Sequence, residues 1–485
     1  MCPRELPPED RPPDAGHDRP KVPTGVAGLD EVLRGGVPRG AMTLLVGGPG
    51  TGKTMVGMEF LVRSAMREEP GILLTFEERE EALRLYGTGL GWNISGLEEA
   101  GMLTIISARL QADSMLSGDF DLQALMAILR RKAEEIGAER LLLDAPDVLL
   151  RLLDDPARER AELYALHEWM LDSGMTSVMT VKASAGGGAV DYGFLDYMAD
   201  CVIHLDQRVY NQVTTRRLRV VKYRGSQYGR NEYPFGITDR GVRIIPVTQT
   251  SLEHRALGDD LSTGVPDLDR LLSGGYRRGS CTLITGGSGT GKTTFLSSFA
   301  ISSARAGERV LYLDFEESRD ALFTCMRSPG LDLQPAWEGG NLRFISVMPE
   351  SQGIEQHLIQ AFRAIEEHRP DHMIVDAISA SRRMGTGQSA FDYLLRLINH
   401  CKQRGVTTLL ANLATAETSG REITGVDLSS VIDTVIMLRY IERKGRYVRE
   451  LGVLKSRGRS HSQRIHRFSI TDDGISIADG EGSDG

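Results

Sequence analysis

A chain of 485 residues with 41% hydrophobic and 25% charged residues has the composition of a globular protein with room for two domains. Its net charge of -9 does not favour nucleic acid as a partner, and no apolar run approaches membrane-spanning length, so we expect a cytoplasmic protein with no membrane contact. Five cysteines without a CxxC pair argue against a zinc ribbon or a disulfide framework.

The two ends of the chain have compositions typical of disorder. Residues 1–21 are dense in proline and charge and poor in aliphatic side chains, and the chain closes on ADGEGSDG. Such segments cannot bury enough apolar surface to offset the entropy lost on ordering. We therefore predict a disordered N-terminal segment, residues 1–21, and a disordered tail, residues 476–485.

The body of the chain contains an internal repeat. Residues 23–54 recur as residues 262–293, and the two copies are 239 residues apart (292 − 53 = 239). Self-similarity at this length indicates a duplicated domain rather than a short-period solenoid. We place the domains at residues 22–246 and 261–475, with residues 247–260 as a polar linker.

Each copy alternates short apolar runs with helical segments. The runs MTLLVGG, GILLTFEE and ERLLLDAP of the first copy correspond to CTLITGG, RVLYLDFEE and DHMIVDAIS of the second. Apolar strands that alternate with helices are typical of a parallel sheet covered on both faces. Each half is thus predicted to be an α/β domain whose ligand site lies at the carboxyl ends of its strands.

Both copies carry a phosphate-binding loop between a strand and a helix. GGPGTGKT and GGSGTGKT match GxxxxGK[ST], in which glycines let backbone N–H groups surround phosphate oxygens and the lysine reaches the outer phosphates of ATP. A chance glycine turn is the alternative for one such match, but two matches in the same context make it remote. The residues predicted to bind the nucleotide here are Gly48, Pro49, Gly50, Thr51, Gly52, Lys53, Thr54, Met55, Gly287, Ser288, Gly289, Thr290, Gly291, Lys292, Thr293 and Thr294.

A magnesium site needs oxygen ligands close to these loops. Thr54 and Thr293 offer hydroxyl groups, and Asp144 and Asp376 each close an apolar run, as RLLLD and HMIVD. A strand-terminal aspartate is otherwise often a helix cap, but the paired P-loops favour the metal role. We therefore predict that Mg²⁺ is a cofactor together with ATP.

Paired carboxylates follow the second strand of each copy. Glu77 and Glu78, like Glu316 and Glu317, are predicted to end a strand, where adjacent side chains point to opposite faces. One glutamate of each pair would then face the nucleotide and orient or deprotonate an attacking hydroxyl or water. A solvated acidic loop is the alternative, but both copies keep the pair 24 residues after the P-loop lysine (77 − 53 = 24).

One basic loop lies far along each copy. VKYRGSQY at residues 221–228 corresponds to LKSRGRSH at residues 454–461, and the lysine and arginine of each loop share one face of an extended segment. This pair of cations suits triphosphate oxygens or nucleic-acid phosphates equally well, and a solvated edge strand is the alternative.

One hydroxyl pair has no counterpart in the other copy. Ser429 and Ser430 precede the run VIDTVIML, and the corresponding positions of the first half are Asp196 and Tyr197. A pair kept only for turn or strand propensity would not need to be confined to one half. We predict that the two serines are phosphoacceptors, modified in sequence because adjacent extended residues face different ways.

The order of these features resembles that of the KaiC family, circadian-clock ATPases and autokinases, over about residues 22–475. The shared features are the duplicated P-loop, the FEE motif, the K-x-R-G loops, EYPFGITDRG and DLSSVIDT. The resemblance implies two tandem RecA-like P-loop NTPase domains, each a mainly parallel sheet flanked by helices. It also implies a homohexameric double ring with ATP between neighbouring subunits, a first domain that hydrolyses ATP, and a second that phosphorylates and dephosphorylates serine.

The resemblance also assigns roles to single residues. Glu77 and Glu316 are similar to general bases, with Glu78 and Glu317 as helpers, Glu316 is also implied as a magnesium contact, and Thr424 resembles an auxiliary hydroxyl. The residues implied to reach the ATP of the adjacent subunit, or to lie close to it, are Lys222, Tyr223, Arg224, Ser226, Tyr228, Thr238, Asp239, Arg449, Lys455, Ser456, Arg457, Arg459 and His461. Supplied in trans, such cations make catalysis depend on assembly, as an arginine finger does.

Some features depart from the family pattern. KSRGRSH stands where the family has KMRGSWH, Pro329 replaces an aromatic residue, and the acceptor pair is Ser-Ser rather than Ser-Thr. The chain stops soon after RFSITDDGISIAD, without the segment on which KaiA acts, so we do not expect KaiA as a partner. A KaiB-like or other signalling protein remains an expected partner.

Two other classes of function share parts of this pattern. A RecA- or DnaB-like motor on nucleic acid has the same core, and salt-sensitive binding to single-stranded DNA that stimulates ATP hydrolysis would identify it. An ATP-responsive scaffold would hydrolyse ATP without placing phosphate on serine. The net acidity and the paired glutamates favour the self-phosphorylating switch over the motor.

Overall fold

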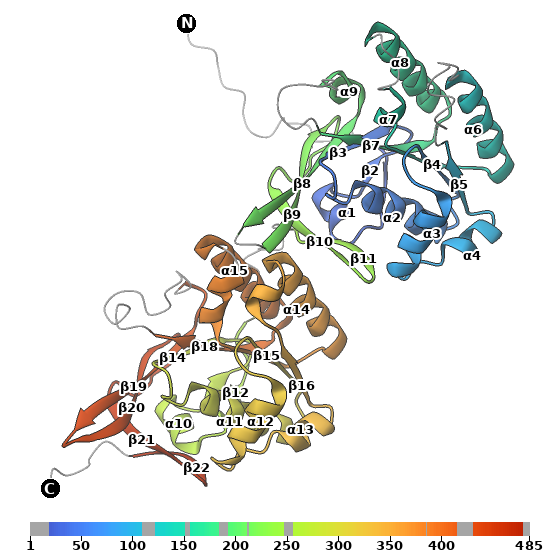
Figure 1. Ribbon diagram of the computed structural model, residues 1–485. Helices are drawn as coiled ribbons and strands as arrows, with labels where there is room; N and C mark the ends of the chain where they lie inside the picture. The colour runs from blue at the N-terminus through green and yellow to red at the C-terminus, as the bar shows by residue number, and fades with distance from the viewer. Residues whose placement is uncertain are drawn as a thin grey trace, which may run out of the picture. The chain divides into compact units, whose positions relative to one another are not determined.

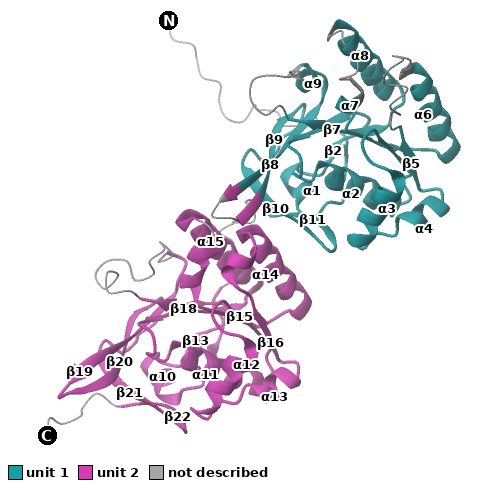
Figure 2. Ribbon diagram, in the orientation of Figure 1, with its two compact units in different colours: residues 1–208, 216–248 teal, residues 209–215, 249–485 magenta. Residues whose placement is uncertain are grey.

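The computed structural model describes residues 19–108, 122–150, 156–183, 193–210, 213–246, 256–384, 386–414 and 430–478. The chain divides into two compact units (Figure 2). Residues 1–208 with 216–248 form the first unit, and residues 209–215 with 249–485 form the second. Each unit has its own sheet and its own core.

The first domain is built on a sheet of nine strands within the described residues, in the order β11-β10-β9-β8-β3-β7-β6-β4-β5. The strands from β8 to β5 pair in parallel, and β9 to β11 form an antiparallel extension. The strands are β3 (Met42–Gly47), β4 (Gly71–Thr75), β5 (Leu103–Ser107), β6 (Arg140–Asp144), β7 (Thr176–Lys182), β8 (Cys201–Tyr210), β9 (Val213–Tyr223), β10 (Glu232–Thr238) and β11 (Gly241–Ile244), with β1 (Lys21–Val22) and β2 (Val37–Pro38) as a separate pair.

Helices cover both faces of this sheet (Figure 1). Leu45 and Leu73 face a core shared with α2, whereas Leu44 and Ile72 face a second core shared with α6 and α8. This alternation is why the central strands are apolar throughout. The helices are α1 (Leu29–Val32), α2 (Lys53–Ala65), α3 (Glu80–Gly89), α4 (Ile94–Glu99), α6 (Leu122–Ile136), α7 (Asp147–Leu150), α8 (Pro156–Asp172) and α9 (Gly193–Met198).

The second domain repeats this plan. Its sheet of nine described strands has the order β16-β15-β17-β18-β14-β19-β20-β21-β22, parallel from β16 to β19. The strands are β14 (Cys281–Gly286), β15 (Val310–Asp314), β16 (Leu342–Ser346), β17 (His372–Asp376), β18 (Thr407–Leu413), β19 (Thr434–Arg443), β20 (Arg446–Ser456), β21 (Ile465–Thr471) and β22 (Gly474–Ile477), with β12 (Asp260–Leu261) and β13 (Tyr276–Arg277) as a separate pair.

Helices flank this sheet as well (Figure 1). They are α10 (Pro266–Leu271), α11 (Lys292–Arg305), α12 (Arg319–Arg327), α13 (Gln334–Glu338), α14 (Ile354–His368) and α15 (Gly387–Arg404), with 3₁₀ turns η3 (Pro349–Ser351) and η4 (Ile378–Met384). The predicted fold class, two tandem α/β domains with mainly parallel sheets, is confirmed. No helix among the described residues is both long and apolar enough to cross a membrane.

The ordered structure extends past the ends that composition predicted. Arg19 forms an ion pair with Asp200 at 2.7 Å, and Lys21 belongs to β1, so the prediction of disorder up to residue 21 is wrong for these residues. At the other end, Ser476 and Ile477 belong to β22, where Ile477 is buried. Pairing of a short edge segment with a neighbouring strand is a tertiary effect that composition does not register. Residues 1–18 and 479–485 lie outside the described residues.

The predicted linker meets the second domain near its end. Asp260 pairs with Arg277 in β12 and β13, and the carbonyl of Gly258 accepts a bond from the Arg277 guanidinium at 3.1 Å. The last residues of the segment 247–260 therefore pack on the second domain, and residues 247–255 lie outside the described residues.

Candidate nucleotide and phosphotransfer sites

The first P-loop connects β3 to α2. Gly52 caps the helix with φ of 97°, a left-handed conformation, and a Cβ there would lie 2.9 Å from Cδ1 of Ile237. Glycine is therefore required both by the backbone and by the space. The Lys53 ammonium donates to the carbonyls of Gly47 and Gly48, both at 2.9 Å, and burial lowers the pKa of Lys53. The helix N-terminus and this lysine present positive charge to the same space, as phosphate binding needs.

The second P-loop has the same geometry. Gly291 caps α11 with φ of 107°, and the Lys292 ammonium donates to the carbonyls of Gly286 at 3.0 Å and Gly287 at 2.9 Å. Burial lowers the pKa of Lys292 as it does that of Lys53. Thr290 folds back onto the Gly287 carbonyl at 2.9 Å, and Thr51 does the same on Gly48.

Each P-loop threonine contacts the predicted strand-terminal aspartate. Thr54 Oγ1 lies 3.0 Å from Asp144 Oδ1, and Thr293 Oγ1 lies 2.8 Å from Asp376 Oδ2. Thr180 also donates to Asp144, at 2.8 Å. Burial is the largest influence on both aspartates and raises their pKa values, while the hydroxyl donors oppose it.

These oxygen groups suit a hard cation. Mg²⁺ is usually held by one or two protein oxygens together with phosphate oxygens and water, and a hydroxyl beside a carboxylate meets that requirement. Among the described residues, no group of three or more His, Cys, Asp or Glu side chains is placed to hold a metal alone. A magnesium ion would therefore need the phosphates of ATP to complete its coordination.

The first-domain glutamates do not lie in a strand. β4 ends at Thr75, and Glu77 and Glu78 follow it in a bend in which Thr75 Oγ1 accepts from the Glu78 amide at 3.2 Å. Both glutamates line a cavity of about 360 Å³ together with Lys53 and Asp144. The expectation that only one glutamate could face the nucleotide, which assumed an extended strand, is therefore wrong for this domain.

The second-domain glutamates are held differently. β15 ends at Asp314, whose Oδ1 accepts from the amides of Glu316 at 2.8 Å and Glu317 at 2.6 Å. The Asp314 side chain is buried, and burial raises its pKa to about 7 although the two amides oppose the shift. Asp314 pairs with Asp376 across neighbouring strands, so two carboxylates lie at this edge of the sheet.

The basic loop of the first domain lies at the amino ends of the parallel strands, opposite to the carboxyl ends that carry the P-loop. Arg224 donates its backbone N–H to the Asp200 carbonyl at 2.8 Å, and Asp200 in turn donates to the carbonyl of Met42, the first residue of β3. The Arg224 guanidinium contacts the Tyr197 carbonyl at 2.5 Å, and Lys222 contacts it at 3.2 Å. The P-loop follows the last residue of β3, so these cations lie away from the P-loop of their own chain.

The second domain has the same separation. Asp433 donates to the Cys281 carbonyl at 2.8 Å and accepts from the Arg457 amide at 2.9 Å, while the Lys455 ammonium donates to the Ile432 carbonyl at 2.6 Å. Cys281 is the first residue of β14 and the P-loop follows its last. The six residues of β14 span about 20 Å, so Lys455 and Arg457 cannot reach the phosphates bound by their own chain.

Ser430 lies at this same edge. It is exposed and comes three residues before Asp433, which is bonded to the start of β14. The P-loop of its own domain therefore lies at the opposite ends of the strands. Ser429 and Thr424, the other predicted hydroxyls, lie outside the described residues.

The other residues that the family resemblance implied as contacts of the nucleotide fall into two groups. The first group is held by contacts within its own domain or loop. Tyr223 is buried, with its hydroxyl on the Gly36 carbonyl at 2.8 Å, so its side chain is not available to a ligand. Arg459 is engaged within its own domain by Asp260 and by the carbonyl of Gly275. Three residues make bonds within their own loops, namely Ser226 to Gln227, Tyr228 to Val221 and His461 to Ser462.

Others lie on the P-loop side of their own domain. Thr238 ends β10 directly after Ile237, which lines the first P-loop cavity, and Asp239 is the next residue. Arg449 lies over the Tyr440 ring at 5.1 Å, and the Tyr440 hydroxyl donates to the Gly289 carbonyl of the P-loop at 2.9 Å. The structure therefore separates Arg449 from Lys455, Ser456 and Arg457, with which the resemblance grouped it.

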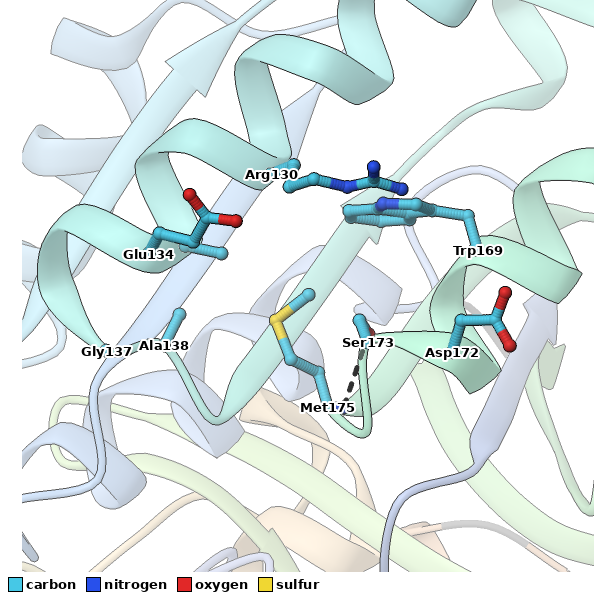
Figure 3. A pocket seen from close by; sticks show the side chains of 9 residues that line it. Arg130, Glu134, Gly137, Ala138, Trp169, Asp172, Ser173 and Met175 are labelled. Atoms are coloured by element: carbon cyan, nitrogen blue, oxygen red, sulfur yellow. Dashed lines mark hydrogen bonds between the residues drawn. The ribbon is translucent and has the colours of Figure 1, made fainter.

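A second cavity of the first domain, of about 530 Å³, lies elsewhere (Figure 3). Figure 3 shows the Arg130 guanidinium above the Trp169 indole, between α6 and α8. The cavity is lined by Ala138 and Met175, which come just before β6 and β7, so it lies at the edge opposite to the P-loop. None of the predicted site residues lines it.

The sequence reasoning missed the polar side chains of four residues at the first P-loop site. Tyr86, Asp147, Thr180 and Lys182 line the first P-loop cavity. Thr180 and Lys182 close the apolar run TSVMTVK, so polar residues at the end of a buried strand were the available signal. Tyr86 is exposed on α3, and the equivalent position of the second copy is Cys325 (86 + 239 = 325), so comparison of the copies gave no signal for it.

Comparisons with known proteins agree with this geometry. The family model "ATPase: KaiC" matches residues 22–249 and again residues 261–482. The chain is 37% identical over 469 residues to circadian clock protein KaiC2 of Synechocystis sp., which covers 95% of this chain and 82% of KaiC2. It is 33% identical to KaiC3 of the same organism, covering 94% and 91%. It is 32% identical to the circadian clock oscillator protein KaiC of Parathermosynechococcus lividus, covering 95% and 86%.

Proposed function

Because this chain belongs to the KaiC family of ATPases, we propose that its first domain hydrolyses ATP and that its second domain transfers phosphate from ATP to serine on a neighbouring copy. The second domain would also remove that phosphate, so the protein acts as a signalling or timing switch. Its partners are other copies of the chain in a homohexamer, and a signalling protein of the KaiB type or another class.

One observation carries the proposal: in each domain, the basic loop lies at the sheet edge opposite to the P-loop of the same chain. Many ATPases bind the outer phosphate with a cation supplied in trans, in addition to the P-loop lysine. Packing the basic edge of one copy against the P-loop edge of the next supplies it. The arrangement supports ATP bound between neighbouring subunits of a ring.

The same arrangement brings an acceptor serine to the neighbour's ATP. Ser430 lies on the edge that carries Lys455 and Arg457, so an assembly that delivers these cations also delivers the serine. Glu316, with Glu317 beside it, is then placed to accept the serine proton as the hydroxyl oxygen attacks the γ-phosphorus and ADP leaves. In the first domain, Glu77 and Glu78 would activate water instead.

Magnesium supplies charge neutralisation at the β- and γ-phosphates when it is bound. Thr54 with Asp144, and Thr293 with Asp376, are the residues we propose to hold it. Lys53 and Lys292 orient the phosphates, and the glycines of each loop allow the backbone to approach them.

Incubation with γ-labelled ATP tests this function. The wild-type chain is expected to incorporate label, and the variants Glu316→Gln and Ser429→Ala/Ser430→Ala are expected to lose it. Lys132→Met, which changes a partly exposed lysine on α6, is a matched control and keeps the label. If the double alanine variant takes up as much label as wild type, the acceptor assignment is wrong.

The same experiment distinguishes the two other functions. If wild type takes up no label but hydrolyses ATP, the protein is an ATP-responsive scaffold. Stimulation of that hydrolysis by single-stranded DNA would indicate a nucleic-acid motor.

A further inference from the structure

The two P-loop sites differ at the last residue of one strand. β7 ends at Lys182, which pairs with Gly47 of β3, and β18 ends at Leu413, which pairs with Gly286 of β14. Because the register is the same in the two domains, Lys182 and Leu413 occupy equivalent positions beside their P-loops. The first domain therefore has a cation where the second has an aliphatic side chain.

The position of β7 aims this cation at the site. β7 lies between β3, which leads into the P-loop, and β6, which ends at Asp144. Thr180 comes two residues before Lys182, so the two side chains share one face of the strand, and Thr180 donates to Asp144 at 2.8 Å. Lys182 lines the same cavity as Lys53 and both first-domain glutamates.

The ammonium of Lys182 is not bound by another side chain or carbonyl in the described structure. It is partly exposed, and within the described ranges no residue forms a hydrogen bond or an ion pair with it. Its charge also acts on Lys53, whose pKa is lowered mainly by burial and to a smaller extent by Lys182. Two cations that repel each other across one cavity favour an anion between them.

We propose that Lys182 binds the terminal phosphate of ATP in the first domain, from the same chain that supplies the P-loop. This inference rests on the proposed nucleotide site. It gives the first domain a contact that ADP cannot make, because ADP ends one phosphate earlier. The second domain, with Leu413 at this position, relies on Lys292 and on the cations of the neighbouring subunit.

The test uses the full-length chain with Lys292→Ala, so that nucleotide binds only to the first domain. The dissociation constants of magnesium ADP and of the magnesium complex of the non-hydrolysable analogue AMP-PNP are measured for each variant. We expect Lys182→Met to weaken AMP-PNP binding by about tenfold to hundredfold, as for loss of a charged hydrogen bond, while ADP binding changes by less than about twofold. Lys182→Arg keeps the charge and is expected to restore most of the affinity.

Two controls make the result decisive. Lys132→Met makes the same change on α6, where the partly exposed ammonium pairs with Glu135, and is expected to leave both constants unchanged. Lys53→Ala removes the P-loop lysine and is expected to weaken both ligands. If Lys53→Ala binds both as well as the parent, the proposed site itself is wrong. If Lys53→Ala is impaired but Lys182→Met either matches the parent or loses ADP and AMP-PNP affinity equally, only the inference about Lys182 is overturned.

Discussion

Asp314 accepts two backbone N–H groups from the glutamate bend, whereas Thr75 at the equivalent position accepts one. We expect Asp314→Ala to free the backbone of Glu316 and Glu317 and to lower second-domain phosphotransfer by about tenfold to hundredfold, as small displacements of catalytic groups do. Label incorporation from γ-labelled ATP measures this.

The matched variant is Asp314→Asn, whose side-chain oxygen can still accept both amides, and it is expected to retain most of the activity. ATP hydrolysis by the first domain, measured in the same preparations, should not change. Full phosphotransfer by Asp314→Ala would show that the two hydrogen bonds do not position the glutamates.

At the same scale, the sequence predicted which glutamates lie near the P-loops but not how the backbone holds them. The even spacing from the P-loop lysines identified Glu77 and Glu316 correctly as neighbours of the loop. Strand periodicity could not show that β4 stops at Thr75, where the Glu78 amide donates a hydrogen bond to the Thr75 hydroxyl oxygen across the bend. Lys182 ends a buried strand, a signal that the sequence offered, whereas the proximity of Tyr86 to the P-loop depends on how α3 packs.

Among the elements, β19 is attached to the rest of the second domain by a buried ion pair. Lys402 on α15 contacts Asp433 at 2.7 Å, and both side chains are less than a tenth exposed. Asp433 Oδ2 also accepts the Cys281 amide at 2.8 Å. The Lys402–Asp433 ion pair therefore fixes the segment from Ser430 to Asp433 to α15 and to the start of β14.

We expect Lys402→Met to destabilise the second domain by about 3–5 kcal/mol, because it leaves the Asp433 carboxylate buried without its counter-charge. Hydrogen exchange of β14 and β19 in increasing urea measures the effect. Lys132→Met should leave these strands as protected as wild type. Equal protection in Lys402→Met would mean that the carboxylate is satisfied by the Cys281 amide alone.

The positions of the P-loops, Asp144 and Asp376 were predictable at this scale because each lies where a strand joins the next element. The ends of the folded chain were not, because pairing of β1 and β22 depends on partners distant in sequence, Pro38 for Lys21 and Phe468 for Ile477.

At the scale of the whole molecule, the separation of P-loop and basic edge makes a single copy incomplete. Each described domain holds its P-loop at the carboxyl ends of its parallel strands and the lysine and arginine of its basic loop at the amino ends. Within the described part of each domain the two lie at opposite ends of the strands, so activity is expected to depend on contact between copies.

Mixing two inactive chains tests this account most directly. Ser429→Ala/Ser430→Ala keeps the second-domain catalytic residues without acceptors, and Glu316→Gln/Glu317→Gln keeps the acceptors without the catalytic residues. Neither is expected to incorporate label from γ-labelled ATP alone, whereas the assembled mixture is expected to label the serines of the Glu316→Gln/Glu317→Gln chain. A labelled wild type together with an unlabelled mixture, after exchange of subunits has been verified, would contradict phosphotransfer between neighbouring copies.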